Sequence, residues 1–189
     1  LLAKKGYLTP QQHTSILKKL GVQTSPIPGY TLLGKIGQGG MGTVYKALQT
    51  SVNRTVAIKI LAPGATKDKT FVARFLQEAQ SAAALNHKNL ISAIDVGISN
   101  GINYFIMEFV TGKSCREVLN AKGPFTEKDA LSIGLQMAEV LEHIHQHQMV
   151  HRDIKPENIM LTAEGQVKLC DLGLAKSTTS MEQSLTQEG

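Results

Sequence analysis

The sequence predicts an α+β fold, because its strand-forming and helix-forming segments occupy different parts of the chain. Short β-prone runs are concentrated between residues 30 and 110. Apolar residues repeat with helical period over residues 70–85 and again over residues 127–148. Two more β-prone runs, at 159–162 and 166–169, flank a turn that contains glycine. We therefore expect an antiparallel sheet with one main helix, followed by a mainly helical second part.

The chain has 189 residues, of which 42% are hydrophobic and 19% charged, enough for one domain and an appendage. No apolar run reaches the ~18 residues of a membrane span and no secretory signal is visible, so we expect no membrane contact in this segment. Its two cysteines suit reduced thiols and a cytoplasmic location. The lysines and arginines behind the formal charge of +5 are scattered, so we expect no nucleic-acid partner.

The first part of the chain, residues 1–25, is expected to form an N-terminal helical extension. Thr9 can cap a helix that has Pro10 in its first turn, and Gly21 would end it. Residues 26–29 form a stiff linker that contains proline. Docking of the extension against the rest of the chain, or against a neighbouring chain, is a hypothesis that the sequence leaves open.

A glycine-rich segment, residues 37–44, lies between two β-prone runs and is expected to form the turn of a hairpin. Gly37, Gly39 and Gly42 lack the Cβ atom that would hold the backbone away from a ligand, so main-chain N–H groups can approach phosphate oxygens. The same spacing occurs in dinucleotide-binding folds, where the third glycine opens a helix. Residues 43–47 have strand character instead, which favours a hairpin that covers the phosphates of a nucleotide.

Two charged residues are expected to act near that nucleotide. Lys59 lies inside the apolar strand 56–60, where a buried ammonium group is costly unless it has anionic partners. Phosphates and a carboxylate would serve, and Glu78 on the helix at 70–85 is the candidate carboxylate. A glutamate on an amphipathic helix is most often simply solvated, and this interpretation stays open for Glu78 taken alone.

The segment at 151–158, together with Asp171, carries the strongest indication of chemistry. It offers a carboxylate, Asp153, that can orient a hydroxyl, and a lysine, Lys155, that can meet a phosphate. Asn158 and Asp171 can hold Mg²⁺. A phosphoryl-transfer transition state spreads charge over phosphoryl oxygens, so positioned cations and an aligned acceptor matter more than a protein nucleophile. These groups therefore indicate phosphoryl transfer.

With these motifs in this order, the chain resembles the eukaryotic-type (Hanks-type) Ser/Thr protein kinases, in particular their bacterial members. The resemblance rests on residues 37–44, the Val56–Lys59 run, Glu78, the segment 151–158 and the Asp171–Gly173 motif. It implies a protein-kinase-like fold.

That fold would have a complete N-lobe over residues 30–110 and only the first part of the C-lobe over 111–189. Because the chain ends at Gly189, inside what would be the activation segment, we expect a fragment of a longer protein.

The resemblance also implies roles for the charged residues. Lys59 would hold the α- and β-phosphates of ATP and pair with Glu78. Asp153 would orient a substrate hydroxyl and accept its proton, while Lys155 would stabilise the γ-phosphoryl group. A lysine at this place is the family's pattern for Ser/Thr acceptors, so the expected partners are protein substrates with Ser or Thr hydroxyls.

The resemblance implies ATP and Mg²⁺ as cofactors, and Mn²⁺ could replace Mg²⁺. Met107 would be the gatekeeper of the adenine site, and the backbone of Glu108 and Val110 would hydrogen-bond adenine. The implied metal ligands are Asn158 and Asp171. The implied nucleotide-binding residues are Ile36, Gly37, Gln38, Gly39, Gly40, Met41, Gly42, Thr43, Val44, Ala57, Lys59, Met107, Glu108, Val110 and Met160. The aliphatic members of this set could equally be plain core residues, and both interpretations hold together if the slot is apolar.

Several alternatives remain at this point. His143 and His147 lie one helical turn apart and could share Zn²⁺, but solvated surface is the favoured interpretation. The chain could be a non-catalytic nucleotide-binding or regulatory interaction module instead of an active kinase. In the family, the apolar stripe of the helix at 127–148 packs against helices beyond residue 189. We therefore expect it to face water here and to promote self-association.

Overall fold

The computed structural model describes residues 23–39, 42–62, 69–171 and 176–177. These residues form two units, one comprising the chain up to Lys69 with Asp95–Phe109, the other Thr70–Ile94 with the chain from Val110 onward. The predicted helix of the N-terminal extension lies outside the described residues. Among the helices that the structure describes, none combines the length and apolar character needed to cross a bilayer.

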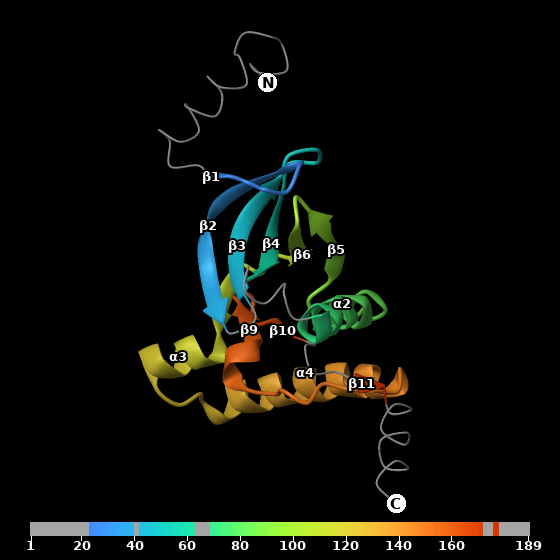
Figure 1. Cartoon of the computed structure of the whole chain (residues 1–189). Coiled ribbons are helices and arrows are strands. Elements are labelled where there is room, and N and C mark those ends of the chain that lie inside the picture. Colours follow the sequence, from blue (N-terminus) through green and yellow to red (C-terminus); the bar gives the residue numbers. More distant parts are fainter. Residues whose placement is uncertain (1–22, 40–41, 63–68, 172–175, 178–189) are drawn as a thin grey trace, which may run out of the picture. The chain divides into compact units, whose positions relative to one another are not determined.

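The first unit is built on a six-stranded sheet with strand order β1-β2-β3-β4-β6-β5 (Figure 1). The strands are β1 (Gln23–Thr24), β2 (Tyr30–Gly39), β3 (Gly42–Gln49), β4 (Arg54–Leu61), β5 (Ala93–Ser99) and β6 (Ile102–Glu108). Neighbours from β1 to β4, and β4 with β6, pair antiparallel. The predicted antiparallel sheet is therefore confirmed, and β1 and β5 are strands that the sequence reading did not single out.

Strand β4 lies in the interior of this sheet because it is flanked by β3 and β6 and carries apolar, largely β-branched residues. Val56 and Ile58 are completely buried, as are Ala47 on β3 and Ile106 on β6. This packing gives a rigid support to the predicted nucleotide-site residues that share these strands.

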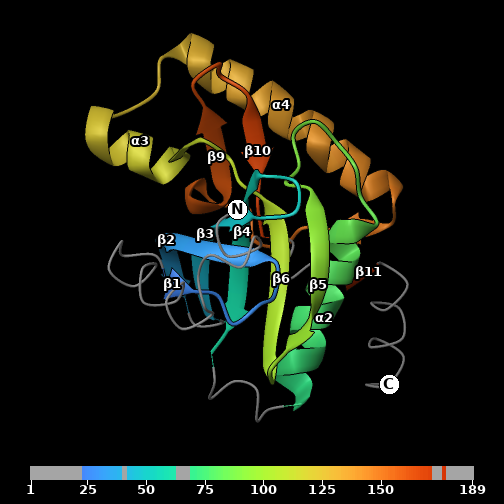
Figure 2. The ribbon, with the colours of Figure 1, turned by 90° about the horizontal axis from the view of Figure 1, so that it is seen from above.

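The second unit contains helices α2 (Lys69–Ala83), α3 (Cys115–Lys122) and α4 (Glu127–Gln146) and a short 3₁₀ turn, η2 (Pro156–Asn158). Strands β7 (Gly112–Ser114), β9 (Ile159–Thr162) and β10 (Val167–Leu169) form a sheet in the order β10-β9-β7. Strands β8 (Met149–Val150) and β11 (Lys176–Ser177) form an antiparallel pair. Figure 2 shows the β9–β10 hairpin beside α4, and the two are in contact through β10.

Local capping explains where the two later helices begin. Ser114 and Glu117 form a reciprocal capping box at the start of α3. Thr126 caps α4 by accepting a hydrogen bond from the backbone N–H of Asp129. Both helices therefore begin where side-chain oxygens satisfy backbone donors that the helix leaves unpaired.

The buried face of α4 differs from the expectation. Met137, Val140 and Ile144, which belong to the stripe expected to face water, are buried. The large apolar side chains of α4 that do face water are those of Leu131 and Leu135, at 67% and 64% exposure. The expectation was wrong for Met137, Val140 and Ile144, because helical period identifies an apolar face but not which element covers it: α4 contacts β8 and β10 of its own unit. Self-association stays a prediction.

Candidate active site

The carboxylate of Asp153 is held by two donors from its own loop. Lys155 Nζ lies 2.6 Å from Asp153 Oδ2, and Asn158 Nδ2 donates to the same oxygen and to the backbone oxygen of Asp153, both at 2.9 Å. The other carboxylate oxygen, Oδ1, receives no hydrogen bond from the described residues. One oxygen is therefore fixed by the protein and the other is open to a ligand.

This arrangement keeps both groups charged. The hydrogen bond from Lys155, outweighing a partial loss of solvation, lowers the pKa of Asp153, and the Asn158 amide adds to the effect. The same bond raises the pKa of Lys155. At neutral pH the site thus presents a carboxylate that only accepts hydrogen bonds, next to a permanent cation.

His151 supports this loop through hydrogen bonds to the backbone. Its side chain is 2% exposed, its Nδ1 lies 3.3 Å from the backbone N–H of Asp153, and its Nε2 lies 3.0 Å from the backbone oxygen of Cys170. A backbone N–H can only donate, so Nδ1 accepts and the proton resides on Nε2. Burial lowers the pKa of His151, which favours this neutral form. The sequence reading placed His151 in the motif without giving it this role.

Cys170 joins the segment 151–158 to Asp171, the predicted metal ligand that follows it. Its backbone N–H donates to Asn158 O at 2.8 Å, and its backbone oxygen accepts from His151. Asp171, the next residue, has φ of 60°, and Arg152 has φ of 65°. Left-handed backbone at non-glycine residues is uncommon and is retained mainly where the surroundings enforce it, often at functional sites.

The donor set at this position fits Mg²⁺, which prefers oxygen ligands. Because Asn158 uses its Nδ2 to hold Asp153, its Oδ1 remains an acceptor without a hydrogen bond from the described residues. Asp171 supplies a carboxylate directly after Cys170, whose backbone is hydrogen-bonded to Asn158 and His151. No cluster of three His, Cys, Asp or Glu side chains in the described part of the chain could hold a metal by itself. A cation here would need further oxygens, such as those of phosphates.

In the first unit, the sheet register brings four predicted nucleotide-site residues onto neighbouring strands. Val44 lies opposite Lys59, and Ala57 lies opposite Met107. Ala57 and Lys59 are two residues apart on β4, so all four side chains project from one face of the sheet. Lys59 is 7% and Ala57 is 6% exposed.

The glycine-rich hairpin is formed by β2 and β3, with Gly37 opposite Val44 and Gly39 opposite Gly42. A Cβ atom on Gly42 would lie 2.1 Å from Ile60 O, whereas one on Gly39 would meet nothing within 4 Å. Close approach to a phosphate is thus not the only reason for glycine in this hairpin, because Gly42 is also needed where β3 pairs with β4. Gly39 leaves open space of the kind that a phosphate needs.

Several other predicted residues of the nucleotide site are also located. Ile36 is 52% exposed, so it is not a core residue. Thr43 lies opposite Gln38 in the hairpin. Met160 lies on β9, half-buried and opposite Ser114 of β7. Gly40 and Met41 lie outside the described residues.

The segment predicted to contact adenine follows the last sheet residues of β6. Met107 and Glu108 end this strand, and Val110 follows it. The Nζ atom of Lys46 lies 4.6 Å from the centre of the Phe109 ring, a cation–π contact that the sequence reading did not anticipate. Only the sheet register, which sets Lys46 opposite Ala57, could have revealed it.

Two further residue sets were singled out from the sequence. Glu78 lies within α2, but its side chain is outside the described residues, so its pairing with Lys59 stays a prediction. His143 is half-buried and its ring packs 5.1 Å from His87 and 4.5 Å from His147. The surface interpretation therefore suits the exposed His147 and holds only in part for the half-buried His143, whose Nε2 is buried.

A hollow of about 820 Å³ in the second unit is separate from the predicted site. It is lined by residues of α3, the first turns of α4 and the β9–β10 turn, and none of the predicted site residues lines it.

Comparison with known proteins gives consistent results. Residues 30–189 match the family model described as protein kinase domain. The chain is 43% identical over 151 residues to a probable serine/threonine-protein kinase of Clostridium perfringens, covering 80% of this chain and 22% of that protein. The serine/threonine-protein kinase PrkC of Bacillus subtilis is 44% identical, with 80% and 23% covered.

A third relative is the serine/threonine-protein kinase PknB of Mycobacterium tuberculosis. It is 38% identical over 160 residues, which cover 82% of this chain and 26% of that protein. The chain thus spans about a quarter of the length of these relatives.

Proposed function

Because the chain belongs to the protein kinase domain family, we propose that its parent protein transfers the γ-phosphoryl group of ATP to Ser or Thr hydroxyls of protein substrates. The observation that carries this proposal is the state of Asp153. Lys155 and Asn158 hold one of its carboxylate oxygens, while the other receives no hydrogen bond from the described residues. An ionised carboxylate so presented can orient a hydroxyl and take up its proton.

In the proposed step, the acceptor oxygen forms a bond to the γ-phosphorus as the bond to the β–γ bridging oxygen breaks, and ADP leaves. The hydroxyl proton passes to Asp153. The ammonium group of Lys155, 2.6 Å from Asp153 before the reaction, neutralises charge on the transferred group. A low pKa at Asp153 is compatible with this role, since a loose transition state depends more on orientation than on a strong base.

Asn158 and Asp171 are the proposed ligands of Mg²⁺, and Mn²⁺, which accepts the same oxygen donors, could take its place. A metal ion bound there would neutralise charge on the phosphate oxygens. Lys59, paired with Glu78, is proposed to hold the α- and β-phosphates. The adenine ring is proposed to lie against Ala57.

The remaining contacts are proposed as follows. The hairpin backbone over residues 36–44 would cover the phosphates, and Val44, Met107 and Met160 would contact adenine with the backbone of residues 108–110. Cys115 and Cys170 are thiols in the structure, which supports a reducing compartment for this segment.

A phosphotransfer assay with ATP, Mg²⁺ and a Ser/Thr-containing protein tests the proposal. It compares the 189-residue chain, a longer form of the protein and the Asp153→Asn variant of each. We expect turnover by the longer form that falls about 100- to 10,000-fold in Asp153→Asn, while nucleotide binding persists. The control is Glu142→Gln, the same change at an exposed carboxylate of α4.

Two results would decide against the proposal. Equal turnover by Asp153→Asn and Glu142→Gln would remove Asp153 from the reaction. Nucleotide binding without turnover in the longer form would favour the non-catalytic binding module. Measured on the 189-residue chain alone, the same assay shows whether this part of the protein binds nucleotide and turns over by itself.

A further inference from the structure

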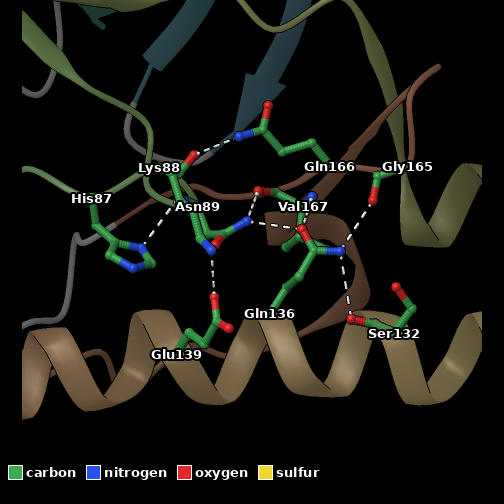
Figure 3. A network of polar contacts seen from close by, with 9 residues as sticks. All are labelled: His87, Lys88, Asn89, Ser132, Gln136, Glu139, Gly165, Gln166 and Val167. Atoms are coloured by element: carbon green, nitrogen blue, oxygen red, sulfur yellow. Dashed lines mark hydrogen bonds and ion pairs between the residues drawn. The ribbon is translucent and has the colours of Figure 1, made fainter.

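Gln136, in the middle of α4, has both polar atoms of its side chain engaged (Figure 3). Its Oε1 accepts from Asn89 Nδ2 and from the backbone N–H of Val167, both at 2.9 Å. Its Nε2 donates to Gly165 O at 3.1 Å and to Ser132 O at 3.4 Å. One carboxamide thus connects the helix, the β9–β10 turn, the first residue of β10 and the segment after α2.

Asn89 continues this connection on the other side. Its side chain is 1% exposed, and its Nδ2 also donates to Val167 O at 2.8 Å. Its backbone oxygen accepts from Leu169 N at 2.8 Å, and Ile91 N donates to Leu169 O at 3.0 Å. Leu90 and Leu169 accordingly form a parallel bridge. The segment after α2 therefore runs beside β10 like an added strand.

Further contacts extend the network at its edge, and the ion pair among them is exposed. Gln166 Nε2 donates to Lys88 O at 3.0 Å, and Lys88 pairs with Glu139 at 2.8 Å. His87 Nδ1 accepts from the backbone N–H of Asn89 at 3.2 Å. Exposed ion pairs contribute little to stability. The buried amide of Asn89 and the half-buried amide of Gln136 therefore provide the specific part of the connection.

Two segments relevant to the chemistry meet at this carboxamide. One is the segment after α2, the helix that carries Glu78. The other is β10, which leads through Cys170 to Asp171. The amide side chain of Gln136 accepts from Val167 N–H and donates to Gly165 O, whereas a carboxylate could not donate and an aliphatic group could do neither.

We propose that Gln136 is a positioning residue for phosphoryl transfer, which holds β10 and the segment after α2 in one register and so fixes where the metal ligand Asp171 lies. This inference rests on the proposed function. Gln136 itself contacts neither of the predicted metal ligands, Asn158 and Asp171, in the described hydrogen bonds, so its effect on metal binding acts through β10.

The test measures how Mg²⁺ changes the binding of a non-hydrolysable ATP analogue to the 189-residue chain and to the longer protein. The variants are Gln136→Leu, which removes all four bonds, and Gln136→Glu, which keeps the acceptor. The control is Gln146→Leu on an exposed turn of the same helix. Binding is measured where circular dichroism shows each protein fully folded.

In Gln136→Leu we expect the Mg²⁺ concentration for half-maximal effect to rise by about tenfold or more, as for other changes behind a metal ligand. In this variant the affinity for the analogue in EDTA should change by less than about twofold. For Gln136→Glu, the Mg²⁺ concentration for half-maximal effect should lie between the values of the unaltered protein and of Gln136→Leu. A purely structural role would lower the melting temperature without moving the Mg²⁺ dependence of the folded protein. That result would overturn the inference.

The two proposals fail in different ways. If the unaltered protein shows Mg²⁺-dependent analogue binding and both Gln136 variants match Gln146→Leu, the inference about Gln136 is wrong and the proposed function stands. If the unaltered longer protein binds no analogue with or without Mg²⁺, the proposed function itself is wrong. Should Gln136→Leu not fold, the same comparison with Gln136→Glu decides.

Discussion

The predicted catalytic loop, residues 151–158, and the glycine-rich hairpin differ in how many of their groups are already hydrogen-bonded or buried within the protein. In the loop, His151 and Asn158 are almost fully buried, and each makes hydrogen bonds that position Asp153. In the hairpin, Gly39 has open space where a side chain would lie, and Ile36 is 52% exposed. In the proposed reaction, the groups that meet developing charge are thus fixed in advance, whereas the hairpin keeps room for a ligand.

Among the changes that test this comparison, and apart from the loss of Asp153 itself, the largest effect is expected at Asn158. Asn158→Leu keeps the volume but removes both bonds to Asp153 and the proposed metal oxygen. We expect phosphotransfer by the longer protein to fall about 10- to 100-fold. The free energy of unfolding should fall by about 1–3 kcal/mol, because Asp153 O loses its donor.

Urea unfolding and the phosphotransfer assay measure these two effects. The matched control is Asn120→Leu, at an exposed position of α3. If Asn158→Leu behaved like this control in both measurements, the loop would not depend on the bonds described.

Two glycine-to-alanine changes sharpen the comparison within the hairpin. At Gly42, where φ is 153°, the new Cβ would meet Ile60 O at 2.1 Å, so we expect a loss of about 1–3 kcal/mol in the free energy of unfolding. At Gly39 the Cβ meets nothing, so stability should change by less than about 0.5 kcal/mol, while affinity for ATP decreases. Thermal unfolding and nucleotide titration separate the two. Equal stability of the two variants would contradict the different surroundings of Gly39 and Gly42 described above.

The pH dependence of the loop gives a smaller effect. Burial lowers the pKa of His151 below its ordinary value of 6.5, so between that folded value and 6.5 the unfolded chain binds more protons. The contribution of His151 is therefore fully present above pH 6.5 and is lost as pH falls through the folded pKa, by at most about 1.4 kcal/mol per pH unit. Titration of the His151 ring by NMR checks this. A midpoint at or above 6.5 would disprove it.

The smallest effect on stability concerns the exposed leucines of α4. Leu131 and Leu135 lie one helical turn apart and form an apolar patch, so we expect the 189-residue chain to self-associate at high concentration. Changing both to Glu should reduce the apparent mass in light scattering while altering stability by no more than about 0.5 kcal/mol. Val52→Glu, at another exposed apolar residue, is the control. A monodisperse unaltered chain would contradict this prediction.

The sequence was sufficient where local pattern decides structure. Periodicity predicted α2 and α4, and glycine with flanking β-prone runs predicted the β2–β3 and β9–β10 hairpins. It could not predict that Asn89 bonds to Val167, 78 residues away, because no local pattern encodes such a pairing. For the same reason it missed β1, which pairs with β2, and it could not tell which face of α4 is covered.

The candidate site shows the same division. The residue types at 151–158 predicted which groups lie together, and the structure brings Asp153, Lys155 and Asn158 into contact. The role of His151 and the engagement of both backbone groups of Cys170 depend on contacts between distant segments. The residues proposed to take part in the reaction were therefore easier to predict from the sequence than the residues that position them.

The open oxygen of Asp153 has a consequence for side reactions. The side chain is 31% exposed, and a carboxylate accepts a hydrogen bond from water as readily as from an alcohol. When no protein substrate is bound, a solvent molecule can occupy the acceptor position and attack in its place. We therefore expect slow ATP hydrolysis, which a bound Ser/Thr peptide would suppress by displacing that solvent molecule.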